Sequence, residues 1–282
     1  MPTVEENLRL AREVLAAAGI ADPPREAASI LSLALSRDRA FLIAHPEYEP
    51  TGEETCRFEN FLDRRAAREP FQYISGIQEF YCLDFEVTPD VLIPRPETEM
   101  VVDAALEFLS RRQEPSFCEV GVGSGCISVS ILHELPKARG VGLDISPAAL
   151  AVASRNASRH GVADRLQLFE SDVFRELDAG RYDLIASNPP YVPAAQFSGL
   201  QDEVRDFEPR AALTDGGDGL SIIAEIIRES PTHLFNGGNL LMEIGFDQSK
   251  AVERLFEPSL WDAVDLMPDL QGIPRLVRAV LK

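Results

Sequence analysis

The sequence predicts an α/β protein in which a doubly wound sheet follows a small helical N-terminal domain, with a β-hairpin linker between them. Apolar residues recur at helical spacing through the first part of the chain, and strand-like and helix-like segments alternate from Phe117 to Lys282. Glycine-rich, acidic and proline-rich loops follow successive predicted strands, at the edge where open α/β sheets bind ligands. We expect the helical domain at residues 1–75, the linker at 76–96 and the α/β domain at 97–282.

Composition limits the classes of function. The 282 residues are 45% hydrophobic and 26% charged, which is typical of a soluble globular protein. The formal net charge of -19 opposes broad binding to a phosphate backbone, so we expect no direct nucleic-acid partner. No segment is apolar enough to cross or anchor in a membrane, and the N-terminus lacks a signal peptide, so we expect a cytoplasmic protein without a membrane partner. We expect no metal, because the cysteines and histidines do not have the spacing of metal ligands. These residues are Cys56, Cys82, Cys118 and Cys126, and His45, His133, His160 and His233.

The N-terminal domain is predicted to contain four helices. The first extends from Thr3 to a C-cap at Gly19, and Pro23-Pro24 opens the second. The third covers residues 39–44 and the fourth residues 53–68. Titratable residues do not cluster here as catalysis would require, which favours a docking or capping role.

The linker is predicted to be a hairpin. Residues 80–87 and 91–93 are rich in aromatic and β-branched residues, and they flank the turn signal Thr88-Pro89-Asp90. The rigid segment 93–99 then leads into a helix at 97–111, which is typical of an interdomain connection.

The α/β domain is predicted from alternating periodicity, which indicates a parallel sheet. The candidate strands are residues 117–120, 140–144, 166–170, 182–187, 239–244, 263–266 and 275–281. The candidate helices are residues 126–135, 147–160, 220–228 and 248–256.

The strand at 182–187 stops abruptly at Asn188-Pro189-Pro190-Tyr191. Two prolines cannot continue a strand ladder, so these four residues should form a stiff loop. The loop offers two acceptors, the Asn188 side-chain oxygen and the Pro189 carbonyl, beside an aromatic wall from Tyr191. This arrangement suits a planar amino group and makes Asn188, Pro189, Pro190 and Tyr191 the candidate catalytic residues. The alternative is a strand that simply ends in a proline-rich turn.

Three further loops indicate a cofactor site. Glycines alternate in the loop from Gly121 to Gly125, which opens a predicted helix, and Asp144 ends the next strand 19 residues after Gly125. The third loop is Glu170 to Phe174. Taken singly, these loops could be a tight turn, a helix N-cap and a solvated loop. The glycine spacing is Gly-x-Gly-x-Gly, which disfavours a nicotinamide cofactor, and Glu119 suits a positively charged ligand. We interpret the loops as a site for S-adenosyl-L-methionine.

Asn-Pro-Pro-Tyr is the hallmark of methyltransferases that modify amide or exocyclic amino nitrogens. The chain as a whole resembles the glutamine-N5 methyltransferase family of class I peptide chain release factors (PrmC/HemK). The matching segments are residues 69–76, 93–99, 121–125, 144–146, 187–191, 208–213 and 216–220.

The resemblance implies a Rossmann-like sheet of the class I methyltransferase type. It also implies methyl transfer from S-adenosyl-L-methionine to the glutamine of the Gly-Gly-Gln motif in class I release factors, which would be the protein partners. Asp144 would hold the ribose, Val173 would border the adenine, and Asn188 to Tyr191 would hold the substrate glutamine, with Asn188 also at the cofactor. The helical domain would help to recognise the release factor, and we expect a monomer. The methionine end of the cofactor would be lined by Gly121, Val122, Gly123, Ser124 and Gly125.

Two departures from the family pattern concern the cofactor site. Val122 stands where relatives commonly have a small hydroxyl residue, and Val173 replaces an aromatic residue found in some relatives.

Two alternatives stay open. The same loop could hold a flipped adenine in a DNA or RNA adenine-N6 methyltransferase, against which the acidic charge counts. The second alternative is a non-catalytic protein that only binds the cofactor, and the intact Asn-Pro-Pro-Tyr loop counts against it.

Overall fold

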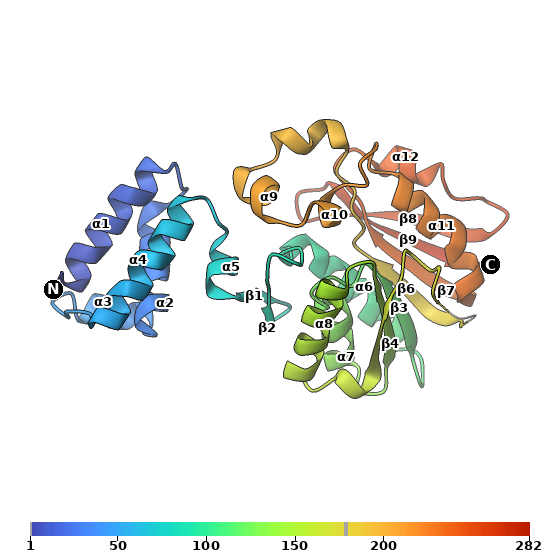
Figure 1. Cartoon of the computed structure of the whole chain (residues 1–282). Helices are drawn as coiled ribbons and strands as arrows, with labels where there is room; N and C mark the ends of the chain where they lie inside the picture. The colour runs from blue at the N-terminus through green and yellow to red at the C-terminus, as the bar shows by residue number, and fades with distance from the viewer. Residues whose placement is uncertain (1, 178–179) are drawn as a thin grey trace. The chain divides into compact units, whose positions relative to one another are not determined.

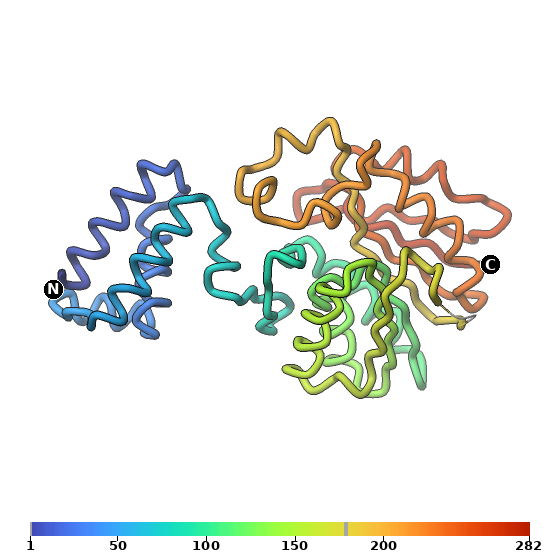
Figure 2. The backbone as a smooth tube through the Cα atoms, in the orientation of Figure 1, coloured from blue at the N-terminus to red at the C-terminus, as the bar shows by residue number. Residues whose placement is uncertain are grey.

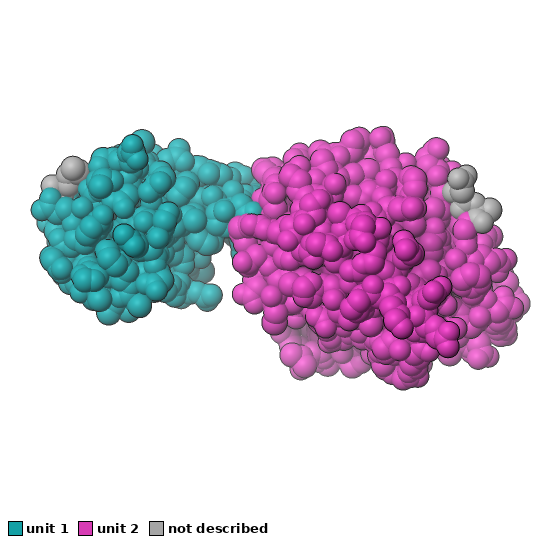
Figure 3. Space-filling view, turned by 90° about the horizontal axis from the view of Figure 1, so that it is seen from below, with its two compact units in different colours: residues 1–76, 201–207 teal, residues 77–200, 208–282 magenta. Residues whose placement is uncertain are grey.

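The computed structural model describes residues 2–177 and 180–282, which form two compact units. The first unit contains the chain up to Gly76 together with residues 201–207, and the second contains residues 77–200 and 208–282 (Figure 3). Each unit has its own buried apolar core.

The first unit is helical, as predicted. Thr3 and Thr51 close capping boxes with Glu6 and Glu54, which explains where two of the helices begin. The unit's core includes Leu15, Ile30, Leu31 and Phe58. Its helices are α1 (Val4–Ala17), α2 (Pro23–Leu35), α3 (Arg39–Ala44), α4 (Gly52–Ala66), the unpredicted α5 (Phe71–Ser75) and α9 (Asp202–Phe207).

Helix α9 belongs to this unit although it lies between two strands of the second unit in the sequence. Arg65 in α4 is nearly buried, and its guanidinium contacts Glu26 at 2.8 Å and Glu203 at 3.0 Å. A buried cation requires such partners, since an unpaired charge in the interior is costly.

The predicted hairpin is present, but its position was wrong. Strands β1 (Ile77–Phe80) and β2 (Leu83–Glu86) pair antiparallel, and the turn is Tyr81-Cys82, not Thr88-Pro89-Asp90. Both turn residues have positive φ, 52° and 58°, as a two-residue hairpin turn requires. Neither is a residue that favours this conformation, so the sequence carried no turn signal there. The Tyr81 amide donates to Glu99 and its hydroxyl to Asp103, both at 2.8 Å.

The second unit is built on a mixed sheet of seven strands in the order β5-β4-β3-β6-β7-β9-β8 (Figure 1). The pairs from β5 to β7 are parallel, as predicted. Strand β9 runs antiparallel to both β7 and β8, which corrects the expectation of a wholly parallel sheet. The strands are β3 (Ser116–Val120), β4 (Arg139–Asp144), β5 (Leu166–Glu170), β6 (Tyr182–Ser187), β7 (Leu234–Glu243), β8 (Trp261–Pro268) and β9 (Pro274–Leu281).

Helices cover both faces of this sheet. Successive strand residues point to opposite faces, and Phe117 of β3 belongs to one apolar cluster while Cys118 belongs to the other. The first cluster includes residues of α6 (Glu99–Leu109), α7 (Cys126–Glu134) and α8 (Pro147–Arg159). The second includes residues of α11 (Ser221–His233) and α12 (Ser249–Glu253). The remaining short helices are η1 (Pro96–Thr98), η2 (Ala163–Arg165), η3 (Ala194–Gly199) and α10 (Arg210–Leu213).

The parallel strands place four loops at one edge of the sheet. Strands β3, β4, β5 and β6 are neighbours and run in one direction, so the segments that follow Val120, Asp144, Glu170 and Ser187 emerge side by side. The path of the chain through these strands can be followed in Figure 2. Across the described ranges, no helix is both long and apolar enough to cross a membrane.

Candidate active site

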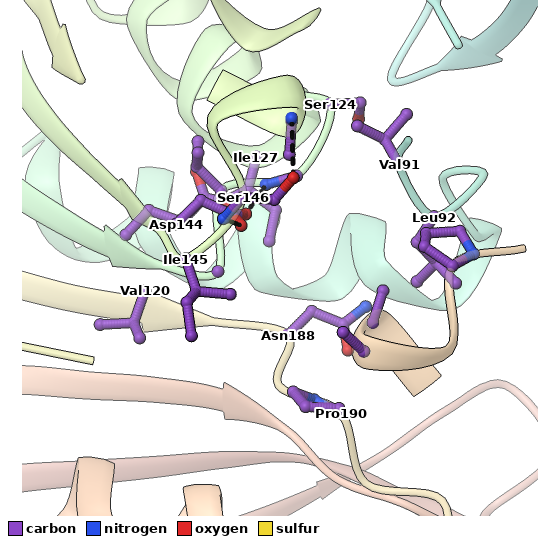
Figure 4. A pocket seen from close by; sticks show the side chains of 18 of the residues that line it. Val91, Leu92, Val120, Ser124, Ile127, Asp144, Ile145, Ser146, Asn188 and Pro190 are labelled. Atoms are coloured by element: carbon purple, nitrogen blue, oxygen red, sulfur yellow. Dashed lines mark hydrogen bonds between the residues drawn. The ribbon is translucent and has the colours of Figure 1, made fainter. Parts of the chain in front are cut away.

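A pocket opens at the edge where these four loops meet, and all of its lining residues belong to the second unit. Asn188 and Pro190 approach it from one side, and Asp144, Ile145 and Ser146 from another (Figure 4). Further lining residues come from the segment before α6 and from the region of α10. The pocket therefore combines the four loops expected to form the site with two segments, before α6 and around α10, to which no site role was assigned from the sequence.

The glycine loop between β3 and α7 forms the floor of the pocket. Gly121, Gly123 and Gly125 all have positive φ, a conformation that favours glycine. The amides of Gly121 and Val122 donate to the Leu143 carbonyl at 2.8 and 2.9 Å, which holds the loop against β4. Residues 121–124 line the pocket, so this loop is more than a tight turn.

Asp144 ends β4 with its carboxylate in the pocket wall. One carboxylate oxygen accepts from the Gly123 amide and the other from the Ser146 amide, both at 2.9 Å. The N-cap of α8 is Ser146 and not Asp144, which excludes the capping role considered from the sequence. Burial raises the pKa of Asp144, while the amide bonds oppose this shift. Each carboxylate oxygen retains a lone pair for a further donor, such as a ribose hydroxyl.

The loop after β5 adds an apolar surface. Val173 is buried at the pocket with a φ of 55°, an unusual conformation for a β-branched residue. The Ser171 hydroxyl donates to the Val173 carbonyl at 2.9 Å, and the Ser171 amide donates to the Asp144 carbonyl at 2.9 Å. Asp172 also lines the pocket and pairs with Arg175, so it is not only a solvated loop residue. With Ile145, whose side chain is well exposed, Val173 offers apolar contact to a flat ring.

Glu119 is a buried carboxylate in the pocket wall. The residue is 1% exposed, and one of its oxygens accepts from both the Ser128 amide, at 2.9 Å, and the Ser128 hydroxyl. Burial raises the pKa of Glu119 to about 8, against the effect of the Ser128 hydrogen bonds. A cationic ligand in the pocket would favour the ionised form of this group.

The Asn-Pro-Pro-Tyr loop contributes unevenly to the pocket. Asn188 and Pro190 are among the lining residues, whereas Pro189 and Tyr191 are not. The Asn188 side-chain amide donates to the Thr98 hydroxyl at 3.1 Å. The Tyr191 hydroxyl donates to Glu243 at 3.2 Å, so the ring is held from the end of β7.

The segment before α6 forms a wall of the pocket, although the sequence indicated only a linker. Val91, Leu92, Arg95 and Thr98 all line it. Arg95 pairs with the buried carboxylate of Glu208, which also accepts from the Ile93 amide at 3.2 Å. The motifs at 93–99 and 208–213, which carry the family resemblance, are therefore in direct contact.

Sequence reasoning did not assign a site role to Arg95, Thr98, Glu208 or Glu243. Arg95, Thr98 and Glu208 lie in the segments that match the family, and this match could have marked them as site residues. Glu243 lies at the end of a predicted strand and outside those motifs, so no sequence signal marked it.

Gln248 and Gly219 support the Asn-Pro-Pro-Tyr loop from behind. The Gln248 side-chain amide donates to the carbonyls of Tyr191 at 2.9 Å and Gly219 at 3.2 Å. Asp215 accepts from the amides of Gly217 at 2.8 Å and Gly219 at 3.0 Å, which fixes the chain at this point. The last residue of the loop is thus held through its own backbone carbonyl, and the neighbouring Gly219 backbone is fixed as well.

We expect Gly219→Ala to lower the free energy of unfolding by at least about 2 kcal/mol. A Cβ there would lie 2.8 Å from the Tyr191 carbonyl carbon, and the φ of 80° adds strain. Gly217→Ala is the matched control, because its Cβ would have no neighbour closer than 3.6 Å and its φ is not positive. Urea denaturation of the two variants measures the difference, and equal midpoints would contradict the tight contact.

Comparison with known proteins identifies the family. The family model of the PrmC N-terminal domain matches residues 6–76, and that of the methyltransferase small domain matches residues 100–207. The catalytic domain of hMettl16, in complex with MAT2A 3′UTR hairpin 6, has a TM-score of 0.58 at 15% identity and covers 78% of this chain and 81% of its own. The Thermus thermophilus 16S rRNA N2 G1207 methyltransferase (RsmC), in complex with AdoMet and guanosine, has a TM-score of 0.54 at 16% identity and covers 73% and 50%. These two likenesses show the methyltransferase fold alone.

Two relatives extend the match over nearly the whole chain. The release factor glutamine methyltransferase of Geobacter sulfurreducens is 43% identical over 98% of this chain and 95% of its own. The one from Cereibacter sphaeroides is 46% identical over 98% of both. The chain belongs to the release factor glutamine methyltransferase family, whose methyl donor is S-adenosyl-L-methionine.

Proposed function

We propose that this protein transfers a methyl group from S-adenosyl-L-methionine to the side-chain amide nitrogen of the glutamine in the Gly-Gly-Gln motif of class I peptide chain release factors. The observation that carries the proposal is a single pocket in which Asn188 lies opposite the glycine loop and Asp144. The family relationship supplies the substrate. We include in the proposal a monomeric protein that acts in the cytoplasm.

The residues present fit the cofactor. We assign the methionine end to the loop of Gly121, Val122, Gly123, Ser124 and Gly125, where the three glycines, all with positive φ, leave the backbone open at alternate positions. Asp144 would accept from the ribose hydroxyls through its remaining lone pairs. Val173 and Ile145 would contact the adenine. When bound, the cofactor supplies a methyl group on a positively charged sulfur, and Glu119 offers a compensating negative charge.

The two departures from the family pattern have a structural context. Val122 is buried, and its side chain packs so closely over Gly142 that a Cβ there would lie 2.9 Å from it. Valine in place of a hydroxyl residue thus fills space against β4. At position 173 a smaller side chain reduces the ring contact, and Ile145 supplies apolar surface beside it.

Asn188 and Pro189 are proposed to activate the substrate amide. An amide nitrogen is a weak nucleophile because its lone pair is delocalised into the carbonyl. When the Asn188 side-chain oxygen and the Pro189 carbonyl accept its two N–H bonds, electron density on nitrogen rises and the lone pair can face the methyl group. With the cofactor held by the glycine loop, Asp144 and Val173, the nitrogen–carbon bond would form as the carbon–sulfur bond breaks, and the electron pair of the broken bond would stay on the sulfur. The product nitrogen is then strongly acidic and loses its proton to water.

The proposal is tested by methyl transfer from labelled S-adenosyl-L-methionine to a purified bacterial class I release factor. We expect label on the intact factor and none on a variant with alanine in place of the Gly-Gly-Gln glutamine. Duplex DNA is the third substrate, and we expect no label there because the net charge of -19 opposes a phosphate backbone. Label on DNA alone, or equal label on the alanine variant, would support the adenine-N6 alternative or another target residue.

Asn188→Ala should lower kcat on the order of 100-fold, since the substrate amide would lose one hydrogen-bond acceptor and its alignment with the methyl group. Affinity for S-adenosyl-L-methionine, measured by calorimetry, should fall far less than kcat. Asn236→Ala is the control, because Asn236 is exposed on β7. An unchanged kcat for Asn188→Ala would remove the proposed role of this side chain.

Glu119→Gln should remove a pH dependence of cofactor affinity. Below pH 8 the free protein holds Glu119 largely protonated, so binding of a cation must release that proton. Affinity should therefore rise with pH, by up to about tenfold per pH unit, until it levels off near pH 8. The cofactor's own amino group titrates equally with the unchanged protein and with Glu119→Gln. The difference between their curves of affinity against pH, measured by calorimetry, therefore reports Glu119. Parallel pH curves would show that Glu119 does not face the cofactor's charge.

A further inference from the structure

We infer that Thr98 and Glu243 are positioning residues that orient the Asn188 side-chain amide, so that its oxygen faces the substrate and its NH2 group faces away. This inference rests on the proposed function and deepens it. It adds to the site two residues that do not touch the reacting atoms and that set which substrate groups Asn188 can bind.

The three side chains form a continuous chain of hydrogen bonds. Glu243 ends β7, Thr98 ends η1 immediately before α6, and Asn188 follows β6. The Thr98 hydroxyl donates to Glu243 at 2.6 Å and accepts from the Asn188 amide at 3.1 Å. Thr98 is 2% exposed and Glu243 is 3% exposed, so water cannot substitute for either partner.

The direction of this chain follows from elementary hydrogen-bond chemistry. An ionised carboxylate can only accept, and a threonine hydroxyl has a single hydrogen to donate. Because Thr98 gives that hydrogen to Glu243, it can only accept from Asn188. Asn188 must therefore turn its NH2 group toward Thr98, and the planar amide then directs its oxygen the other way. Because Asn188 lines the pocket, an acceptor is left for the N–H bonds of a glutamine amide.

Glu243 holds both ends of the Asn-Pro-Pro-Tyr loop. Its second oxygen accepts from the Tyr191 hydroxyl at 3.2 Å, while the first holds Asn188 through Thr98. One buried carboxylate thus fixes the first and last residues of the loop relative to β7. An amide acceptor presented by a rigid loop costs little further ordering when the substrate binds.

This direction holds for the ionised form of Glu243, which its two oxygens, each accepting from a hydroxyl, indicate. Burial raises the pKa of Glu243 and the nearby Glu97 adds to the shift, whereas the bonds from Thr98 and Tyr191 and the charge of Arg275 oppose it. An uncharged group at this position could donate to Thr98, and Thr98 could then donate to the Asn188 oxygen. Glu243→Gln creates this situation with almost no change of shape, which makes it an informative variant.

The experiment compares Thr98→Val, Thr98→Ser and Glu243→Gln with the unchanged protein. The first readout needs no substrate. The chain has six asparagines, so selective 15N labelling gives six side-chain amide signals, and Asn188→Ala identifies the one from Asn188. We expect its NH2 protons to be shifted and slow to exchange in the unchanged protein and in Thr98→Ser. The shift and the protection should be lost in Thr98→Val and Glu243→Gln.

The second readout is methyl transfer to the release factor. In Thr98→Val and Glu243→Gln, kcat should fall on the order of 100-fold with unchanged affinity for S-adenosyl-L-methionine. Thr98→Ser should retain most of the activity because it keeps the hydroxyl. Full kcat in Thr98→Val or Glu243→Gln, or an Asn188 signal that does not respond to them, would overturn the inference. If the unchanged protein does not methylate the factor while the Asn188 signal responds as expected, the proposed function fails and the positioning chain stands.

Discussion

The buried carboxylate of Glu243 is the interaction on which, we propose, the geometry of the candidate active site depends. It accepts from the hydroxyls of Thr98 and Tyr191 and so connects β7 to the start of α6 and to the loop after β6. Burying a charge costs free energy unless donors surround it. Here two hydroxyl bonds oppose part of this cost, although burial still raises the pKa of Glu243, and they give the polar atoms of the loop a defined direction. Gln248 also holds this loop through the Tyr191 carbonyl, and Asp215 fixes the neighbouring backbone at Gly219.

The sheet explains how one pocket collects the loops to which we assign the cofactor and the substrate. The loops that follow four parallel neighbouring strands lie at one edge of the sheet. The residues of each loop then decide which groups it presents to the pocket. Glycines leave backbone exposed, Asp144 supplies a carboxylate fixed by two amides, and Val173 supplies apolar contact. The Asn-Pro-Pro-Tyr loop ends the fourth strand and faces the other three. The antiparallel β9 lies beyond β7, away from this edge of the site.

Much of the fold and several loops of the candidate site were predictable from short segments of the sequence. Strands β5 and β6 were predicted with the bounds that the structure has. The apolar run of β6 ends at Asn188 and two prolines, and β5 ends where Ser171 and Asp172 begin a polar loop. The loops around Gly121, Asp144 and Asn188 were recognised because each carries its own composition signal. The turn at Tyr81-Cys82 was missed, since neither residue usually adopts a positive φ. Thr98 and Glu243 are 145 residues apart, and their contact exists only once β7 lies beside β6. A pattern read along the chain cannot reveal that pairing.

The measurement that tests this account most directly is a neutron crystal structure with S-adenosylhomocysteine and a Gly-Gly-Gln peptide bound. Deuterium positions distinguish the nitrogen and the oxygen of an amide, which ordinary X-ray data do not. We expect deuterium on the Asn188 nitrogen directed at Thr98, deuterium on the Thr98 hydroxyl directed at Glu243, and the Asn188 oxygen accepting from the peptide's glutamine amide. An Asn188 nitrogen directed at the glutamine, or a glutamine bound away from Asn188, would contradict it.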